Sequence, residues 1–425
     1  MKVLVVGGGG REHALCWALR RDLNTPELFC APGNPGTAEL ASNLPIGPLD
    51  DGHLISAAQE RGIELIVIGP EAPLAAGVAD RLRAAGLLVF GPSASAAKIE
   101  SSKAFAKEVM RAAGIPTAPS QTFHELAPAL GYVDRQQEPL VVKASGLAAG
   151  KGAIVCATRA EARRIVTGML RDGMFGAAGQ EIVVETFLQG EELSILAISN
   201  GLDLRVLPPA QDHKRLREGD VGPNTGGMGA YSPVSLATPA LLAQVERQVL
   251  RPALEELARR NTPFSGVLYA GLMLDAAGSF HVIEFNCRFG DPEAQVILPR
   301  VRSGLLDAFL AAAKAESLPA LTESPGTTVT TVLAAAGYPE EPRRGDPITL
   351  PEELPRGTIL FHAGTQRDAE GVLRTAGGRV LAATALAPSF AQARQASREA
   401  AERIEFEGKQ FRSDIGWREA ARVAG

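Results

Sequence analysis

The stretch LVVKASGLAAGKGAIVCA, residues 140–157, indicates how the middle of this chain folds. Both ends of the stretch are apolar and contain β-branched residues, a pattern typical of buried strands. The centre, Ser145–Gly152, is rich in glycine. We therefore expect two strands, Leu140–Ala144 and Ala153–Ala157, that are joined directly by a glycine loop. This segment predicts a small α+β unit.

The first hundred residues follow a different pattern, in which short apolar runs alternate with helical stretches. This alternation predicts an α/β domain with a doubly wound parallel sheet. Its expected strands are Lys2–Val6, Glu27–Ala31, Ile63–Ile68 and Leu87–Phe90, and its expected helices are Glu12–Arg20, Leu54–Arg61 and Leu74–Ala85. Ligands bind such sheets beyond the carboxyl ends of the strands. Those ends carry Gly7–Gly10, Gly33–Gly36 and Gly69–Glu71, which together predict the rim of a pocket.

Breaks in the pattern divide the chain into three expected domains, residues 1–100, 101–325 and 326–425. The second begins with a helix, Lys103–Ala113, and contains a hairpin near residues 267–287. Residues 208–233 show little periodicity, and long loops of this kind are usually functional or disordered. The third domain has three strand-like runs and a final helix, which predict a mixed β-sheet: 328–335, 357–363, 379–384 and 390–404.

Composition excludes several classes of protein. The chain has 425 residues, a net charge of −5 and no basic stripe, so neither nucleic acid nor an anionic membrane is expected as a partner. No apolar run approaches the roughly 20 residues of a membrane helix, and the N-terminus lacks the pattern of a signal peptide. The four cysteines are far apart in the sequence, which fits a reducing compartment. We expect a cytoplasmic protein.

The loop Gly7–Gly10 invites comparison with dinucleotide-binding loops. Glu12 stands where the third glycine of that fingerprint belongs, and the strand that ends at Ala31 lacks the acid that binds a ribose. An NAD site is therefore disfavoured. Backbone N–H groups at the start of a helix still suit a phosphate, and a purely structural tight turn is the alternative.

The loop Ser145–Gly152 follows a strand that carries Lys143 near its end. Glycine permits close approach of the backbone to a polyphosphate, and lysine supplies positive charge. The loop departs from the Walker pattern because Gly152 stands where serine or threonine is required. We expect a mobile flap over nucleotide phosphates, and an ordinary hairpin loop is the alternative.

Alternation along the strand Phe280–Arg288 predicts that Val282, Glu284, Asn286 and Arg288 share one face. A carboxylate and an amide oxygen, about 6.6 Å apart along a strand, can share Mg²⁺, which prefers oxygen ligands and bridges to phosphates. Arg288 could then meet phosphate oxygens with its planar guanidinium. A solvated strand face with an ion pair is the alternative. His13 and His213 have no metal-binding spacing and are expected to form hydrogen bonds.

Five strings resemble the ATP-grasp ligases, and more closely the phosphoribosylamine–glycine ligases, also called glycinamide ribonucleotide synthetases. They occur in the order expected for that family: GGGGREHAL (7–15), KASGLAAGKG (143–152), QDHKR (211–215), PNTGGMGAY (223–231) and IEFNCRFGDPEAQ (283–295). Residues 377–381 and 412–416 extend the resemblance into the last domain. The resemblance implies a central ATP-grasp domain with a small lid at about residues 118–190.

The resemblance also implies roles for individual residues. ATP would be bound by Lys103, Lys143, Ser145, Gly146, Gly150, Lys151, Gly152, Glu185, Leu188 and Glu192. Mg²⁺ or Mn²⁺ would be bound by Glu284 and Asn286, and the catalytic residues would be Arg288, Lys143 and Asp212. The substrates glycine and 5-phosphoribosylamine would meet Gly9, Gly10, Arg11, Asn34, Asp212, Lys214, Asn224, Thr225, Gly226, Gly227, Arg288, Asp291 and Pro292.

The activity implied by the resemblance is the ligation of glycine to 5-phosphoribosylamine through glycyl phosphate, by a monomer. Many ATP-grasp enzymes carry a second metal-binding acid on the preceding strand, where this chain has Tyr269–Met273. The narrower family shares that departure, and Asp275 is a weak candidate for the second metal. Another ATP-grasp ligase or carboxylase is the nearest alternative, and an NAD-linked oxidoreductase is more distant.

Overall fold

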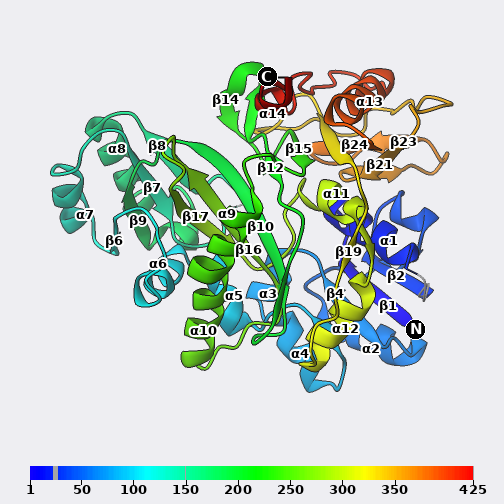
Figure 1. Cartoon of the computed structure of the whole chain (residues 1–425), viewed down its shortest axis with the longest axis horizontal. Helices are drawn as coiled ribbons and strands as arrows, with labels where there is room; N and C mark the ends of the chain where they lie inside the picture. Colours follow the sequence, from blue (N-terminus) through cyan, green and yellow to red (C-terminus); the bar gives the residue numbers. More distant parts are fainter. Residues whose placement is uncertain (23–26, 149, 425) are drawn as a thin grey trace.

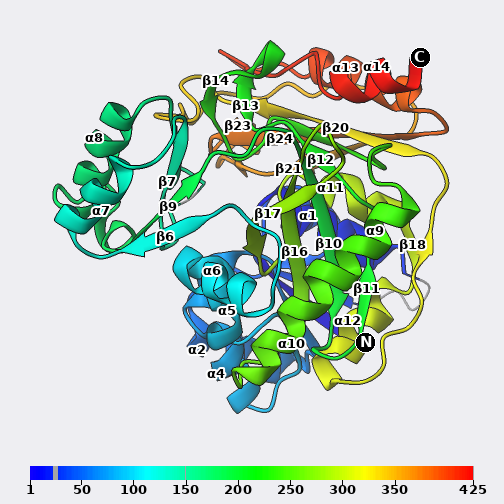
Figure 2. The ribbon, with the colours of Figure 1, turned by 60° about the vertical axis from the view of Figure 1, so that its left-hand side comes forward.

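A computed structural model describes residues 1–22, 27–148 and 150–424. The chain forms an N-terminal domain, a central domain from which a lid projects, and a C-terminal domain (Figure 1). The lid, with α7 (Leu126–Val133) and α8 (Arg159–Leu170), stands apart from the other helices in two views (Figures 1 and 2). The three-domain fold class expected from the sequence is confirmed, and the domain limits at residues 100 and 325 stay predictions.

The N-terminal domain contains one five-stranded sheet in the order β3-β2-β1-β4-β5. All four strand pairs are parallel, so the doubly wound sheet is confirmed. The strands are β1 (Lys2–Gly7), β2 (Glu27–Pro32), β3 (Ser42–Asn43), β4 (Leu65–Ile68) and β5 (Val89–Phe90). The helices are α1 (Gly10–Arg20), α2 (Asp51–Arg61), α3 (Glu71–Ala75) and α4 (Val78–Ala84). Chain order reverses between β1 and β4, the place where such sheets bind ligands.

The single helix expected over Leu74–Ala85 is wrong. The chain forms α3 and α4, separated by Gly77, which has a φ of +77°. A left-handed residue cannot continue a right-handed helix, and glycine adopts that conformation without steric cost. The break leaves Glu71 in the first turn of a short helix at the carboxyl edge of the sheet.

The central domain contains two sheets. Its larger sheet has the order β11-β10-β16-β17, and the lid sheet has the order β6-β9-β7-β8. The larger sheet comprises β10 (Glu191–Ser199), β11 (Leu204–Val206), β16 (Gly266–Leu274) and β17 (Phe280–Asn286). The lid sheet comprises β6 (Ser120–Phe123), β7 (Leu140–Ala144), β8 (Ala153–Cys156) and β9 (Ile182–Thr186). Helix α5 (Ala94–Ser101) leads from the N-terminal domain into the central domain, whose helices are α6 (Lys103–Ala112), α9 (Pro239–Val245), α10 (Arg251–Arg259), α11 (Ala294–Ile297) and α12 (Leu305–Lys314).

The C-terminal sheet has the order β12-β15-β20-β24-β21. Every pair in it is antiparallel, which corrects the mixed sheet expected from the sequence. Its strands are β12 (Gln211–Asp212), β15 (Gly229–Ser232), β20 (Thr327–Ala334), β21 (Thr358–His362) and β24 (Arg379–Ala387). Helices α13 (Phe390–Arg403) and α14 (Trp417–Ala424) follow, and small ribbons are formed by β13 (Arg215–Arg217) with β14 (Val221–Asn224), β18 (Val301–Ser303) with β19 (Thr322–Glu323), and β22 (Thr365–Arg367) with β23 (Leu373–Thr375).

The segment 208–233, expected to be a loop, supplies β12 and β15 to that sheet. Each strand is too short to show a period of two in the sequence. β12 pairs with β15, and β20, the other partner of β15, lies about a hundred residues further along the chain. Asp212 is therefore held on a strand that the C-terminal domain anchors. This register carries the polar string QDHKR to the centre of the molecule.

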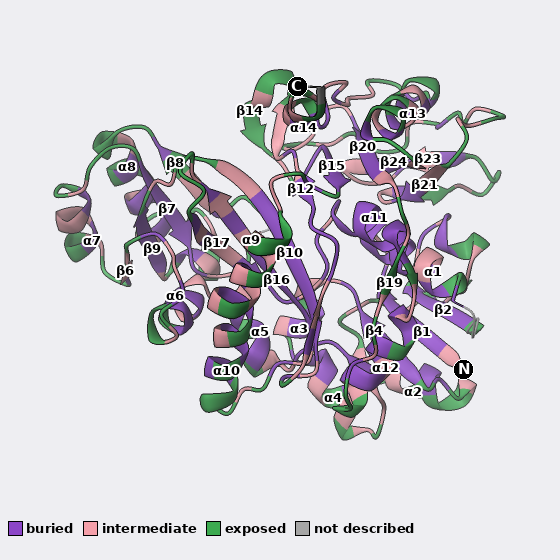
Figure 3. Cartoon of the chain, viewed as in Figure 1, coloured by how far each residue is buried: buried purple, intermediate pink, exposed green. Residues whose placement is uncertain are grey.

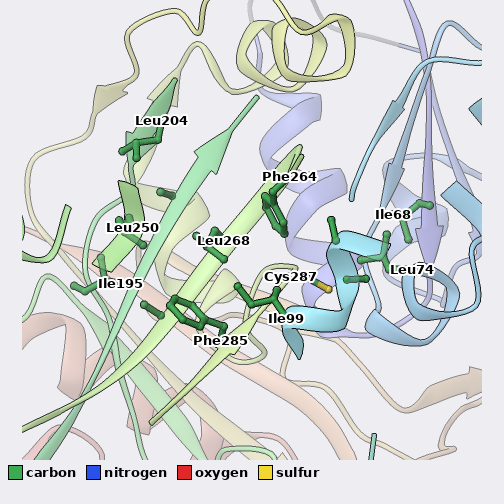
Figure 4. Close-up of a cluster of buried hydrophobic side chains, with 14 of the residues drawn as sticks. Ile68, Leu74, Ile99, Ile195, Leu204, Leu250, Phe264, Leu268, Phe285 and Cys287 are labelled. Atoms are coloured by element: carbon green, nitrogen blue, oxygen red, sulfur yellow. The ribbon is translucent and has the colours of Figure 1, made fainter. Parts of the chain in front are cut away.

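One apolar core joins the domains. It includes Ile68 and Leu74 from the N-terminal domain, Ile99 from α5, and Leu268 and Phe285 from the central sheet (Figure 4). Burial of one such side chain contributes about 1.5–3 kcal/mol, so a shared core ties the domains into one body. Buried residues follow the strands of both large sheets, while buried and exposed residues alternate along the outer helices (Figure 3). No helix in the described part of the chain is long and apolar enough to span a bilayer.

Candidate active site

A cavity of about 530 Å³ lies between the lid, the central sheet, the N-terminal domain and the C-terminal sheet. Most residues predicted for the site line it: Arg11, Lys103, Lys143, Gly150, Gly152, Glu185, Leu188, Glu192, Asp212, Lys214, Asn224, Thr225, Gly226, Glu284, Asn286, Arg288 and Asp291. Strings far apart in the sequence thus meet in one place. Gly9, Gly10, Asn34, Ser145, Gly146, Lys151, Gly227 and Pro292 do not belong to the lining.

The lid side of the cavity has a buried carboxylate between two lysines. Glu185, at the end of β9, pairs with Lys143 from β7 and with Lys107 from α6, the latter at 2.6 Å. Burial raises the pKa of Glu185, but the two ammonium charges outweigh it and lower the pKa. Lys143 also donates to the carbonyl of Ile283, 3.0 Å away on β17. This pairing fixes the charge of Lys143 at the base of the glycine loop.

The base of the loop Ser145–Gly152 is anchored, whereas its tip is open. The Ser145 hydroxyl accepts a hydrogen bond of 3.1 Å from the Ala104 backbone, and Lys103 Nζ donates to the Gly146 carbonyl at 3.3 Å. At Gly150 the φ is +76° and an added Cβ would meet nothing within 4 Å. Lys151 Nζ reaches the Pro339 carbonyl of the C-terminal domain at 3.2 Å. The loop therefore bridges one side of the cavity opening.

A β-bulge places the residues that face the cavity on β17. Gly271 pairs with Glu284 and Leu272 pairs with Val282, which leaves Ile283 as the extra residue. Alternation therefore changes phase at this point, and bulges commonly redirect side chains beside active sites. Glu284, Asn286 and Arg288 face the cavity together, as predicted. The placement of Val282 with them is wrong, because its side chain is fully buried in the apolar core.

Glu284 combines the properties of a cation ligand. Burial raises the pKa of its carboxyl, but Lys214, Lys143 and Lys103 lower it further than burial raises it. The carboxylate forms no hydrogen bond or ion pair with other described residues, so both oxygens remain available. The Asn286 side chain accepts a 3.2 Å hydrogen bond from Arg288. This donor set of oxygens fits a hard divalent cation.

Arg288 is held by acids from two other elements. Its Nη2 pairs with Glu100 of α5 at 2.7 Å, and its Nε pairs with Glu71 of α3 at 3.2 Å. Burial lowers the pKa of the guanidinium, but the charges of Glu100 and Glu71 outweigh it and raise the pKa. Two carboxylates that fix a guanidinium in one position leave its charge directed at the cavity. Such preorganisation favours a developing negative charge.

Asp212 and Lys214 lie two positions apart in the segment that the C-terminal sheet anchors. Lys214 Nζ pairs with Glu192 Oε2 at 2.5 Å, while the Asp212 carboxylate forms no hydrogen bond or ion pair with another described residue. Burial raises the pKa of Asp212 to about 8, and Lys214 opposes that rise. This end of the cavity therefore holds a carboxyl group that titrates near neutral pH.

Arg379 of the C-terminal domain joins the loop at Gly226 to the turn at Asp291. Arg379 donates to the carbonyls of Gly226 and Asp291, each at 2.6 Å, and pairs with the Asp291 carboxylate at 3.0 Å. An added Cβ at Gly227 would lie 2.4 Å from Pro292. Gly227 and Pro292 thus support the cavity wall from behind.

The glycine loop at residues 7–10 encloses Glu12 tightly. The Glu12 carboxylate accepts a hydrogen bond of 2.7 Å from the Gly9 N–H and pairs with Arg11 at 2.6 Å. Asn34 is used structurally, since its amide donates to the carbonyls of Gly8 and His362 and accepts from Gly36 and Thr37. The predicted substrate contacts of Gly9, Gly10 and Asn34 therefore lie at the edge of the site, and only Arg11 of this region reaches the cavity.

Several cavity residues escaped the sequence analysis: Glu71, Glu100, Lys107, Tyr269, Glu293 and Arg379. Glu71 was quoted only as part of a rim loop, and Tyr269, Glu293 and Arg379 lie inside quoted stretches without an assigned role. Glu100 and Lys107 lie on α5 and α6, which meet the other elements of the site only in the fold. Their signal in the sequence is a charged residue on a helix, which many surfaces share.

Two other expectations concern residues outside the cavity. The histidines form hydrogen bonds as predicted: His13 Nδ1 accepts from the His362 backbone and His213 Nε2 from the Gly416 backbone, both at 2.8 Å. Asp275 lies in the turn between β16 and β17, where its carboxylate accepts from the backbone of Ala277 and Ser279. It does not line the cavity, so it is not placed to bind a second metal there.

Comparison with known proteins gives one consistent result. Residues 1–100 match the N domain of phosphoribosylglycinamide synthetase, residues 101–294 its ATP-grasp domain, and residues 328–418 its C domain. A phosphoribosylamine–glycine ligase from Ralstonia nicotianae is 48% identical over 98% of this chain and 99% of its own length.

Solved structures agree in fold. The crystal structure of a phosphoribosylamine–glycine ligase from Thermotoga maritima is 34% identical, covers 97% of this chain and 100% of its own, and superposes with a TM-score of 0.87. The biotin carboxylase domain of a 2-oxoglutarate carboxylase from Hydrogenobacter thermophilus, solved with MgADP and bicarbonate, covers 96% of this chain and 91% of its own at a TM-score of 0.72. Its identity is 19%, so the likeness is one of fold alone.

Proposed function

The chain belongs to the phosphoribosylglycinamide synthetase family, and we propose that its cavity joins glycine to 5-phosphoribosylamine while ATP is converted to ADP and phosphate. The observation that carries the proposal is the convergence of Glu284, Asn286 and Arg288 with the lysines beneath the glycine loop in one cavity. The product would be glycinamide ribonucleotide, an intermediate of purine biosynthesis. We further propose that the protein acts as a cytoplasmic monomer.

ATP is proposed to lie between the lid and the central sheet. Lys103 and Lys143 face the phosphates, and the loop Ser145–Gly152 covers them. The chain around Leu188 receives the adenine, while Glu192 receives the ribose. The lysines neutralise negative charge that would otherwise repel an incoming carboxylate, and most of the catalysis of phosphoryl transfer consists of such positioning and neutralisation.

Glu284 and Asn286 are the proposed ligands of Mg²⁺ or Mn²⁺. A divalent ion held by these two residues would neutralise negative charge on the phosphates of ATP. The donor set fits, because Glu284 is an anionic carboxylate with free oxygens and Asn286 adds a neutral oxygen. Arg288 stands beside them and stabilises the transferring phosphoryl group.

The proposed reaction has two steps. A carboxylate oxygen of glycine attacks the γ-phosphorus, the bond to ADP breaks, and glycyl phosphate forms. The amine of 5-phosphoribosylamine then attacks the acyl carbon, phosphate leaves with that carboxylate oxygen, and the amine loses a proton. Closure of the loop Ser145–Gly152 excludes water from the acyl phosphate, the usual purpose of such lids. Orientation of the reactants supplies on the order of 7–11 kcal/mol.

The test is ADP release from the purified protein with Mg-ATP and glycine, with and without freshly generated 5-phosphoribosylamine. The proposal predicts release that requires both substrates, with one phosphate formed per ATP. ADP release that depends on bicarbonate and not on glycine would instead identify a carboxylase. Binding of NAD, followed by cofactor fluorescence, would identify an oxidoreductase.

A further inference from the structure

The segment Gln211–Arg215 has two faces, and the proposed reaction uses only one of them. Asp212 and Lys214 line the cavity, whereas Gln211 and His213 are buried outside its lining. This is the alternation of a strand, in which successive side chains point to opposite faces. Whatever fixes the back of the segment therefore sets the positions of Asp212 and Lys214 in the cavity.

The back of the segment is fixed by residues 412–422, which we call the C-terminal clamp. It begins with the string at 412–416 that lies outside the cavity and has no part in the proposed reaction. Three contacts join the clamp to alternate positions of the segment: the Gly416 N–H to His213 Nε2 at 2.8 Å, Arg412 Nη1 to the Arg215 carbonyl at 3.1 Å, and Arg422 Nη2 to Gln211 Oε1 at 3.5 Å. The clamp thus contacts the face opposite to the cavity.

Arg412 is the centre of the clamp. Its fully buried guanidinium forms two hydrogen bonds with the Asp414 carboxylate, at 2.7 and 2.8 Å, and pairs with Asp220 at 2.7 Å. Asp220 lies between β13 and β14 with a φ of +56°, a conformation uncommon outside glycine. Buried ion pairs often add no more stability than apolar residues of the same size. A network of this kind is therefore better explained by the geometry that it fixes than by stability alone.

His213 connects this network to the cavity residues. Burial lowers the pKa of its imidazole, so the ring is neutral at pH 7. Because Nε2 accepts a hydrogen bond from Gly416, the ring proton is on Nδ1, which lies 3.5 Å from Asp220 Oδ1. The imidazole is held between Gly416 and a carboxylate that Arg412 fixes. Since Asp212 and Lys214 flank His213 in the chain, a displacement of the ring moves both.

We propose that Arg412 is a positioning residue for Asp212 and Lys214. This assignment rests on the proposed function, in which those two side chains contact the substrates glycine and 5-phosphoribosylamine. The clamp holds the back of the segment so that its front presents a carboxyl and an ammonium group in fixed places before the substrates arrive. Such placement matters, because a shift of about 1 Å in a site can lower a rate on the order of 100-fold.

The proposal confines the effect of a loosened clamp to one part of the reaction. Lys103 and Lys143, the proposed phosphate contacts, lie on α6 and β7. The clamp forms no hydrogen bond or ion pair with either element in the described part of the chain. Loss of the clamp should therefore reduce kcat/KM for glycine and leave the KM for ATP unchanged. A general loss of stability would not separate these two quantities.

The experiment compares wild type with Arg412→Lys, Asp220→Asn and the control Arg300→Lys. Lysine keeps the positive charge but lacks the planar fork that binds two carboxylates at once. Arg300 is also buried, 7% exposed, and pairs with Glu323 at 3.2 Å outside the cavity. Asp220→Asn keeps an acceptor for Arg412 and removes one charge, so it is the milder variant if Arg412→Lys folds poorly. The readouts are kcat, the KM for glycine, the KM for ATP and the midpoint of thermal unfolding.

Arg412→Lys should lower kcat/KM for glycine about 10- to 100-fold, the range of a small misplacement in a site, without changing the KM for ATP. Arg412→Gln, which also loses the charge, should lower it further, so that lysine partly restores the rate. Asp220→Asn should show the same pattern with a smaller loss. Arg300→Lys should lower the midpoint of thermal unfolding without either kinetic change.

Three results overturn the assignment in different ways. Wild-type kinetics in Arg412→Lys and Asp220→Asn, with a lowered unfolding midpoint, would show that the clamp only stabilises the fold, and the proposed function would stand. A matching rise in the KM for ATP, or an equal kinetic loss in Arg300→Lys, would show a general disturbance of the molecule in place of positioning. No glycine-dependent ADP release by wild type overturns the proposed function, and the assignment with it.

Discussion

The chain has two glycine-rich loops, and glycine serves a different purpose at the tip of the second loop, Gly150, than in the first loop. In Gly7–Gly10 a Cβ has no room: one added at Gly7 would lie 2.5 Å from Glu12, and one added at Gly8 would lie 2.6 Å from the Gly33 carbonyl. At Gly150, in the loop Ser145–Gly152, a Cβ would meet nothing within 4 Å. The first loop links a parallel strand to a helix in the interior, and the second links two antiparallel strands at the surface.

The difference separates a fixed part of the site from a movable one. Glycines packed against Glu12 hold one rigid backbone arrangement, which keeps the neighbouring Arg11 in a fixed place at the cavity. In the second loop only Gly150 has open space around it, and this freedom suits the proposed cover over ATP. Gly146 and Gly152, at the base of that loop, are packed, since an added Cβ would lie 2.7 Å from Ala178 and Ala148 respectively. Glycine content alone does not distinguish these uses. The neighbours of each glycine do.

The largest expected effect on turnover comes from a change at the proposed metal site. Glu284→Gln removes the anionic oxygen at the proposed metal site and should lower kcat on the order of 10²–10³-fold, as for loss of one strong electrostatic contact in a transition state. The measurement is steady-state ADP release, with circular dichroism to verify the fold. Asp275→Asn, in the hairpin turn, is the control and should keep wild-type turnover. Near wild-type kcat in Glu284→Gln would refute the metal assignment.

Gly7→Ala tests the rigidity of the first loop. The φ of +128° is strained for alanine, and the methyl group collides with the Glu12 side chain. We expect the free energy of unfolding of the N-terminal domain to fall by about 3 kcal/mol, combining overpacking with backbone strain. Denaturant unfolding monitored through Trp17 measures it. A loss below about 1 kcal/mol would mean that the loop is as adaptable as the flap.

Acid should lower the free energy of unfolding of the region around the loop Gly7–Gly10, because two histidines, His13 and His362, are buried there. Burial lowers the pKa of His13 to about 3 and that of His362 to about 4, with the neighbouring charges of His362 and Arg367 acting in the same direction. Because an unfolded histidine titrates near 6.5, the unfolded state takes up protons first as pH falls. Stability present above pH 6.5 is therefore lost toward pH 4, by about 1.4 kcal/mol per pH unit for each histidine.

Thermal unfolding at pH 7.5 and pH 5, followed by Trp17 fluorescence in a Trp417→Phe background, measures this loss. His13→Gln should show a shallower dependence on pH, because Gln does not titrate. Equal slopes for wild type and His13→Gln would contradict the lowered pKa of His13, because its protonation would then not be coupled to unfolding.

Gly150→Ala should have the smallest effect. Its φ of +76° costs alanine about 1 kcal/mol, but no atom lies in the way. We expect an unchanged midpoint of thermal unfolding and a several-fold higher KM for ATP, because only the covering loop is disturbed. A drop in that midpoint as large as that of Gly7→Ala would remove the distinction between the two loops.

Much of this architecture can be predicted from the sequence, wherever an element is determined by residues close to one another in the chain. Apolar runs and glycine breaks gave the parallel sheet and the hairpin of β16 and β17, and alternation gave the shared face of Glu284, Asn286 and Arg288. The bulge at Ile283 could not be predicted, because it depends on pairing with Gly271 on the neighbouring strand. It moved Val282 into the core and left the other three in place.

Long-range contacts explain the remaining differences. β12 and β15 are strands only because β20 pairs with β15 and β15 with β12, so 208–233 looked like a loop. The role of Arg379 depends on Asp291, 88 positions earlier in the chain. Asn34 occupies a glycine loop at the expected edge, but the bonds that consume its amide come from His362 and the turn at Thr37.

The most direct test of the whole account follows an oxygen atom. Glycine labelled with ¹⁸O in its carboxylate is supplied with Mg-ATP and 5-phosphoribosylamine, and the released phosphate is analysed by mass spectrometry. If the cavity forms an acyl phosphate, one carboxylate oxygen moves to each phosphate, and the account predicts one ¹⁸O per phosphate formed. Phosphate without ¹⁸O would contradict it, because ATP would then be cleaved by water and not by the glycine carboxylate.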